Sequence, residues 1–137
     1  MYLFDSSSIV NLVKKGVLKP LAAGATINLA VYESVNAVWK EHRLLGKIDG
    51  RIAAEWIALL AEIFNTIPVY PLSELGEMDR VLTGIFSLAV SEGVTVYDAS
   101  YIYAAETMGL VLVTDDSRLR SAAEKHVKTL TSAQLIV

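Results

Sequence analysis

Carboxylates spread widely along this sequence are the residues best suited to carry chemistry. They occur at Asp5, Glu33, Asp98 and the adjacent pair Asp115 and Asp116. If they meet in one crevice, their mutual repulsion raises their pKa values or weakens folding unless a cation lies among them. Mg²⁺ and Mn²⁺ prefer oxygen ligands, and such ions can activate water and neutralise charge on a phosphate. The pattern therefore indicates metal-dependent cleavage of a phosphodiester.

Strand-like and helix-like segments alternate along the chain. Strands are expected at 2–4, 26–31, 110–113 and 127–130, with short extended segments at 68–71 and 94–97. Helices are expected from about 8 to 15, 33 to 45, 50 to 63, 74 to 91, 98 to 108 and 118 to 125, with a short last one after Thr131. This order predicts a three-layer α/β/α domain, residues 1–137, around a parallel sheet of four to five strands.

The acids fall close to the expected ends of these strands. Asp5 ends the first strand, Glu33 follows the second and opens a helix, and Asp115 and Asp116 follow the run before Thr114. Asp98 opens a helix after an extended segment. Ligands of such sheets bind beyond the carboxyl ends of the strands. Taken singly, each acid is better explained as part of a helix start, where a carboxylate is worth about 0.3–1 kcal/mol, and only their convergence indicates a site.

Composition excludes several other classes of protein. The chain has no cysteine, which removes disulfide scaffolds, cysteine zinc sites and thiol nucleophiles. Its net charge of −3 argues against a protein that coats nucleic acid by charge alone. The longest uncharged run, residues 20–32, is shorter than the roughly 18 residues of a membrane helix, and no basic leader precedes Asp5. A cytoplasmic location is expected.

Four short motifs resemble those of a known family. They are Leu3–Ser7, Tyr32–Glu33, Val96–Ala99 followed by Ala104 and Ala105, and Leu112–Asp116. In order, spacing and context they are similar to the acidic motifs of PIN-domain ribonucleases, and most of all to the VapC-type toxins of toxin–antitoxin pairs. The resemblance covers essentially the whole chain. It implies an endoribonuclease that depends on one or two Mg²⁺ or Mn²⁺ ions, forms a homodimer and is neutralised by a protein antitoxin.

The resemblance also implies a role for individual residues. Asp5, Glu33, Asp98 and Asp116 would be the catalytic and metal-binding quartet. The supporting positions would be Ser7, which matches the small polar residue beside the first Asp, Thr114, which matches the hydroxyl before the last, and Asp115, which would contact metal through water. Arg118 would touch substrate phosphate, although a solvated arginine fits its position equally well.

Two other functions remain open at this point. A phosphoryl-transfer protein of receiver or dehalogenase type also gathers aspartates at strand ends, but Ser6 and Ser7 stand where those sites need a second acid. A PIN-like module that only binds a partner would keep the acids for structure. The apolar helices after Asp5 and Glu33, and the stripe that carries Trp56, are the expected contact surfaces for an antitoxin or a second copy.

Overall fold

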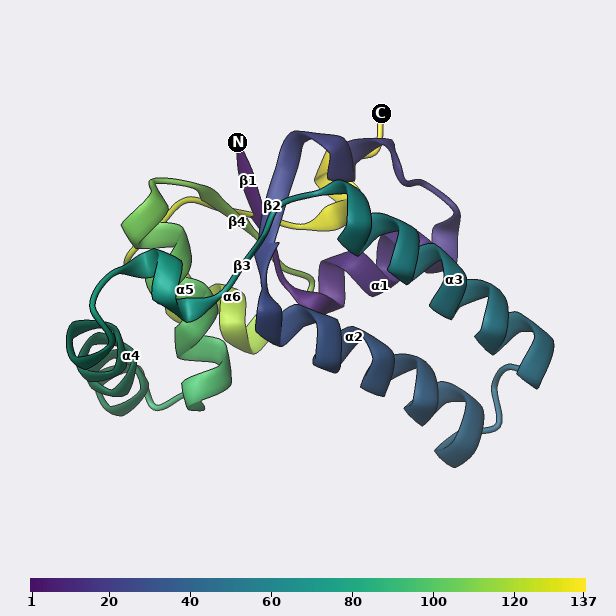
Figure 1. Cartoon of the computed structure of the whole chain (residues 1–137), viewed down its shortest axis with the longest axis horizontal. Coiled ribbons are helices and arrows are strands. Elements are labelled where there is room, and N and C mark those ends of the chain that lie inside the picture. Colours follow the sequence, from purple (N-terminus) through teal and green to yellow (C-terminus); the bar gives the residue numbers. More distant parts are fainter.

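A five-stranded parallel sheet lies at the centre of the computed structural model, which describes residues 1–137 (Figure 1). Its strands have the spatial order β3-β2-β1-β4-β5, and every neighbouring pair is parallel. The strands are β1 (Tyr2–Phe4), β2 (Gly24–Ile27), β3 (Val69–Tyr70), β4 (Val111–Val113) and β5 (Thr129–Leu130). The parallel sheet predicted from the sequence is therefore confirmed, at the upper end of the expected strand number.

Helices cover both faces of this sheet. The α-helices are α1 (Ser6–Lys15), α2 (Asn28–Trp39), α3 (Gly50–Thr66), α4 (Met78–Glu92), α5 (Val96–Met108) and α6 (Ser117–Ala123). Short 3₁₀ turns occur at Lys19–Ala23, Leu72–Leu75 and Ser132–Leu135, and a π turn, Lys40–Leu44, extends α2. Figure 1 shows α1, α2 and α3 on one side of the strands and α4 and α5 on the other, which confirms the three-layer architecture.

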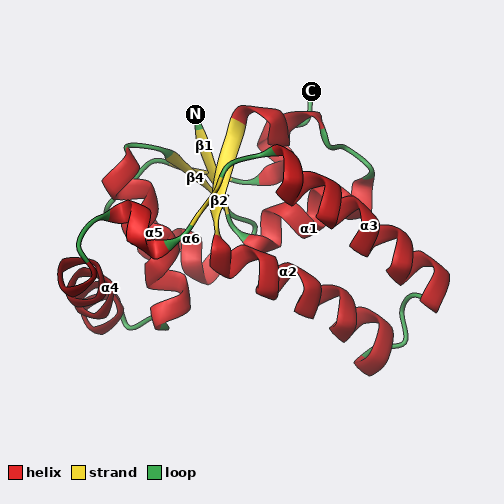
Figure 2. Ribbon diagram, viewed as in Figure 1, coloured by secondary structure: helices red, strands yellow, loops and turns green.

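The sheet is narrow, and helices make up most of the molecule (Figure 2). α2 and α3 pack against each other and reach well beyond the strands. In the two central strands Leu3, Phe4, Leu112 and Val113 are fully buried. A strand covered by helices on both faces reads as a continuous apolar run, which is why β1 and β4 were predictable. None of the helices combines the length and the hydropathy that a membrane span requires.

The second strand ends earlier than its sequence predicts. β2 stops at Ile27, and the helix α2 begins at Asn28 instead of at Glu33. The buried residues Ala30, Ser34 and Val38 recur every four residues, close to the helical period of about 3.6 residues. Residues 29–31, whose composition is typical of a strand, therefore form the first turn of α2. Glu33 lies in the second turn of this helix instead of at its start.

The region before Asp98 also differs from its predicted extended form. α5 begins at Val96, and the Thr95 hydroxyl accepts the backbone N–H of Asp98 at 3.1 Å. This N-cap starts the helix two residues early, so Asp98 belongs to the first turn of α5 and follows no strand. Likewise the helix expected from residue 74 begins at Met78, because Gly76 has φ 139° and separates it from a 3₁₀ turn.

Candidate active site

The two central strands place Asp5 and Asp116 at one edge of the sheet. Phe4 pairs with Val113 at the carboxyl ends of β1 and β4, and the Asp5 backbone N–H donates to the Val113 carbonyl at 3.1 Å. Asp5 follows β1 directly, and Asp116 forms the N-cap of α6, three residues after β4. The strand-end positions predicted for these two acids are confirmed.

Asp5 is a buried carboxylate that accepts hydrogen bonds from several neighbouring groups. Its exposed fraction is 3%. It accepts the Ser7 hydroxyl at 2.8 Å on each oxygen, the Ser8 backbone N–H at 2.9 Å and the Thr114 hydroxyl at 2.5 Å. Burial raises the pKa of Asp5 to about 6, although these hydrogen bonds oppose the rise. Asp5 is therefore a rigidly oriented carboxylate whose negative charge is costly unless a cation is near.

Thr114 links Asp5 to Asp116. Its hydroxyl donates to Asp5 and accepts the Asp116 backbone N–H at 3.1 Å. The Asp116 carboxylate caps α6 through Oδ1 alone, which accepts the N–H groups of Arg118 at 2.9 Å and Leu119 at 3.2 Å. Capping and ligand binding are thus compatible at this residue, because the cap leaves Oδ2 available.

Asp98 lies among the other charged groups of the site. Burial raises its pKa, and the negative charges of Asp116 and then Glu33 raise it further, whereas the Arg118 guanidinium lowers it. Charges that shift the pKa of Asp98 must lie near its carboxylate. Three acids, on α2, on α5 and at the N-cap of α6, therefore share one region of the molecule with the predicted substrate arginine.

Glu33 is held by two hydroxyl groups. Its Oε1 accepts the Tyr101 hydroxyl at 2.7 Å and the Ser6 hydroxyl at 3.2 Å. Tyr101 is only 1% exposed, and burial, followed by the charge of Glu33, raises the pKa of its hydroxyl, which therefore stays a donor. Sequence reasoning missed Tyr101. The available signal was its position three residues after Asp98, on the same helical face.

Asp115 serves the scaffold of the site. Its carboxylate accepts the Asn11 amide at 2.8 Å, the Ser132 backbone N–H at 2.7 Å and the Ser132 hydroxyl at 2.5 Å. Its own backbone N–H donates to the Ser7 hydroxyl at 2.9 Å. These bonds join the end of β4 to α1 and to the last 3₁₀ turn. Asp116, whose charge acts on Asp98, is thus the better candidate for the fourth acid.

The donor set fits a hard divalent cation. Every group is an oxygen donor, and the pKa values of Asp5 and Asp98 are raised, as expected of acids that lack a compensating positive charge. No three of the acidic or histidine side chains converge closely enough to form a complete ligand set in this arrangement. The geometry therefore offers neighbouring carboxylates that an ion would have to draw together.

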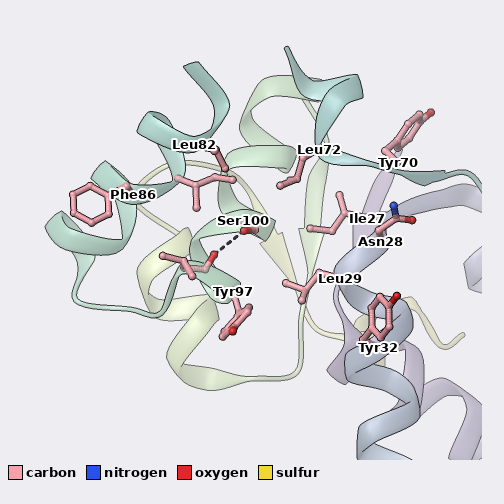
Figure 3. A pocket seen from close by; sticks show the side chains of 12 residues that line it. Ile27, Asn28, Leu29, Tyr32, Tyr70, Leu72, Leu82, Phe86, Tyr97 and Ser100 are labelled. Atoms are coloured by element: carbon pink, nitrogen blue, oxygen red, sulfur yellow. Dashed lines mark hydrogen bonds between the residues drawn. The ribbon is translucent and has the colours of Figure 1, made fainter. Parts of the chain in front are cut away.

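Two cavities open beside the acids. One, of about 610 Å³, contains Glu33 and Ser6 together with polar and aromatic side chains of α2 and α5. The other, of about 660 Å³, is an apolar groove between α2, α4 and α5 (Figure 3). Tyr32 and Tyr97 line both cavities. The acidic site is thus continuous with a larger surface on which other molecules can rest.

Comparison with known proteins identifies relatives along most of the chain. No protein-family model matches it. It is 37% identical over 120 residues to a protein named exonuclease VapC9 from Pyrobaculum aerophilum, covering 86% of this chain and 82% of the relative. It is 38% identical over 106 residues to ribonuclease VapC3 of the same organism, covering 77% of this chain and 73% of the relative.

Solved structures of similar fold point to the same group of proteins as these two sequence relatives. A crystal structure from Pyrobaculum aerophilum has a TM-score of 0.72 and 34% identity, covering 98% of this chain and 92% of the other. DNA-bound VapBC from Salmonella typhimurium has a TM-score of 0.65 at 15% identity, covering 96% and 97%, and supports the fold alone. From the two sequence relatives and the shared architecture, we conclude that this chain belongs to the VapC family of PIN-domain proteins.

Proposed function

We propose that the chain is a metal-dependent endoribonuclease and the toxin of a toxin–antitoxin pair. The observation that supports this function best is the meeting of Asp98, Asp116 and Glu33 in one region, with Asp5 joined to Asp116 through Thr114. Two relatives carry the names exonuclease and ribonuclease. The alternative of a phosphoryl-transfer protein has no support, because Ser6 and Ser7 here hold Glu33 and Asp5 rather than replace a catalytic acid.

The residues of the site would have different roles in the reaction. Asp5, Glu33, Asp98 and Asp116 would hold one or two divalent ions. The hydroxyl groups of Ser6, Ser7, Thr114 and Tyr101 orient two of these carboxylates, Glu33 and Asp5, and Thr114 also accepts the backbone N–H of Asp116. Bound Mg²⁺ or Mn²⁺ supplies positive charge at the phosphate and makes the attacking water more acidic. Arg118, whose charge acts on Asp98, would bind a phosphate oxygen.

Cleavage assays test this function directly. Purified protein incubated with RNA and Mn²⁺ is expected to produce fragments, and an excess of EDTA is expected to stop cleavage, because the carboxylates alone cannot stabilise charge on the phosphate. Restoring Mn²⁺ after EDTA serves as the control for irreversible damage. Equal cleavage with and without EDTA would rule out the metal role, and no cleavage under any condition would favour a binding module.

The hydrogen bond between Tyr101 and Glu33 leads to a further prediction. Tyr101→Phe removes one of the two hydroxyl donors to Glu33 while the ring stays buried. Groups that orient metal ligands typically contribute about 10–100-fold to metal affinity or activity. We expect Mn²⁺ binding measured by calorimetry to weaken by about 10-fold in this variant.

Tyr103 provides the matched control for this substitution. It lies on the same helix, and its ring packs on Gly84, away from Glu33. We expect Tyr103→Phe to bind Mn²⁺ as the unmodified chain does. A Tyr101→Phe variant with unchanged Mn²⁺ affinity would show that Glu33 needs no orientation by this hydroxyl, or that it does not bind the ion.

Exposed apolar surfaces support the expected protein partners. The groove of Figure 3 presents Leu82 and Phe86 of α4, which are 51% and 64% exposed. A second stripe on α2 contains Val35 and Trp39. The VapBC structure from Salmonella typhimurium is a related assembly. We assign these two surfaces to a protein antitoxin and a second copy of the chain. The stripe of α2 was among the predicted contact surfaces, whereas the sequence did not reveal the exposed face of α4.

A further inference from the structure

The cavity next to Glu33 combines three kinds of side chain. Its volume is about 610 Å³, and its walls include Ser6, Tyr32, Glu33, Asn36, Lys40 and Tyr97. Residues 33, 36 and 40 are three and four positions apart, so they share one face of α2 and its π extension. An acid, an amide and a cation therefore follow one another along a single helical edge.

Lys40 is a cation without an acidic partner. The ion pairs of the chain use Lys14, Arg51, Arg120, Lys125 and His126. The nearby Lys14 ammonium, for example, lies 2.6 Å from Glu41. Because the Lys40 ammonium forms no ion pair and lines the cavity that contains Glu33, it is available to bind an anion there.

Two exposed tyrosines flank the acids. Tyr32 precedes Glu33 and is 78% exposed, and Tyr97 precedes Asp98 and is 57% exposed. Figure 3 shows Tyr32 on α2 and Tyr97 on α5, with Leu29 between them. Aromatic rings close to a cationic side chain are platforms on which unpaired bases stack.

The chemistry of this cavity differs from that of the neighbouring apolar surfaces. Val31, Val35 and Trp39 line an adjoining, mostly apolar cavity on α2, which shares Tyr32 and Asn36 with the cavity next to Glu33 but contains neither Glu33 nor Lys40. A protein partner suits that apolar stripe. The cavity with Glu33, Asn36 and Lys40 instead matches a nucleotide, which has an anionic phosphate, a polar base edge and a flat face.

We propose that this cavity binds a nucleotide adjacent to the cleaved phosphate of a single-stranded RNA. The base stacks on Tyr32, the Asn36 amide can bond to the base edge, and Lys40 binds the phosphate. The strand then passes the acids toward Arg118 beside Asp98. This inference rests on the proposed ribonuclease function. It adds to that function the route of the RNA strand across the protein and the requirement that its bases be unpaired.

Binding of a short unstructured RNA labelled with fluorescein tests this site. Fluorescence anisotropy is measured at several NaCl concentrations with Mg²⁺, in an Asp98→Asn background that leaves the RNA uncleaved. Lys40→Gln should reduce the slope of log K against log salt by about 0.7, the value for one phosphate contact on a single strand. Tyr32→Ala should weaken binding by about 10-fold, whereas Tyr32→Phe should bind as before. In the otherwise unmodified chain, the KM for cleavage should rise in parallel and kcat should change little.

Matched controls separate this site from general electrostatics and from a protein interface. Lys128→Gln removes an exposed charge at the start of β5, and it should leave the salt slope unchanged. Duplex RNA should be insensitive to Tyr32→Ala, since its bases are already stacked. The proposal is overturned if the unmodified chain cleaves RNA but Lys40→Gln and Tyr32→Ala change neither slope, affinity nor KM. It is also overturned if they only change self-association in light scattering. A chain that neither binds nor cleaves RNA would refute the ribonuclease function itself.

Discussion

Asp98→Asn is expected to lower the rate of RNA cleavage by about 1,000-fold, equivalent to about 4 kcal/mol of transition-state stabilisation. The charges of Asp116 and Glu33 both raise the pKa of Asp98, so Asp98 responds to two other acids of the cluster. Asparagine keeps the size of the side chain but removes the charge that an ion would neutralise. The N-cap of α5 is preserved, because Thr95 accepts the backbone N–H of residue 98. Initial rates with Mn²⁺ measure the effect.

The folded state of Asp98→Asn should remain intact in metal-free buffer. Since the pKa of Asp98 is raised in the folded protein, its ionised form opposes folding at neutral pH, and the neutral amide relieves that repulsion. The thermal midpoint in EDTA should therefore stay the same or rise. Asp79→Asn, an exposed acid in the first turn of α4, is the control and should retain full activity. If Asp98→Asn cleaves RNA at an unchanged rate, Asp98 is a structural acid and the quartet is wrongly assigned.

Divalent ions are expected to stabilise the protein, and more strongly at neutral than at acidic pH. The pKa of Asp5 rises from 3.8 to about 6 on folding. At low pH both states bind the proton. Between the two pKa values only the folded state holds it, so stability is lost as the pH rises toward 6. The loss for the metal-free protein is about 3 kcal/mol, at roughly 1.4 kcal/mol per pKa unit.

Metal binding should reverse this loss. At 100 times its dissociation constant, an ion that binds only the folded state contributes about 2.7 kcal/mol, or about 10 °C in the melting temperature of a domain of this size. Thermal unfolding with Mn²⁺ at about pH 7.5 and about pH 4.5 measures both effects. NaCl of equal ionic strength is the control, and Asp5→Asn should flatten the pH dependence in EDTA. A shift with Mn²⁺ no larger than that with NaCl would mean that the acids form no metal site.

Apolar runs made part of the site predictable. Leu3 and Phe4 before Asp5, and Leu112 and Val113 before Thr114, are buried on both faces of the sheet, and uninterrupted apolar residues signal such strands. Strand pairing then placed Asp5 and Thr114 side by side, as expected from parallel topology. Ser7, predicted to support Asp5, does so through hydrogen bonds of 2.8 Å.

Helical segments were harder to place. The sequence predicts helices that begin at Glu33 and at Asp98. In the structure these helices begin earlier, at Asn28 and Val96, because the buried face of α2 follows a helical period and the Thr95 hydroxyl caps α5. For α2, burial against the rest of the domain outweighed the strand-like composition of residues 29–31.

The order of residue types along the chain determined which acids could meet. An alternation of strands and helices allows few topologies, and the carboxyl ends of neighbouring parallel strands lie at the same edge of the sheet. Only the tertiary structure decided how each acid is used. Contacts across more than a hundred residues tie Asp115 to the scaffold and Asp5 to Thr114, and a buried Tyr101 turns out to hold Glu33. Hydrogen bonds of this kind depend on distance and angle, which no linear pattern of residue types specifies.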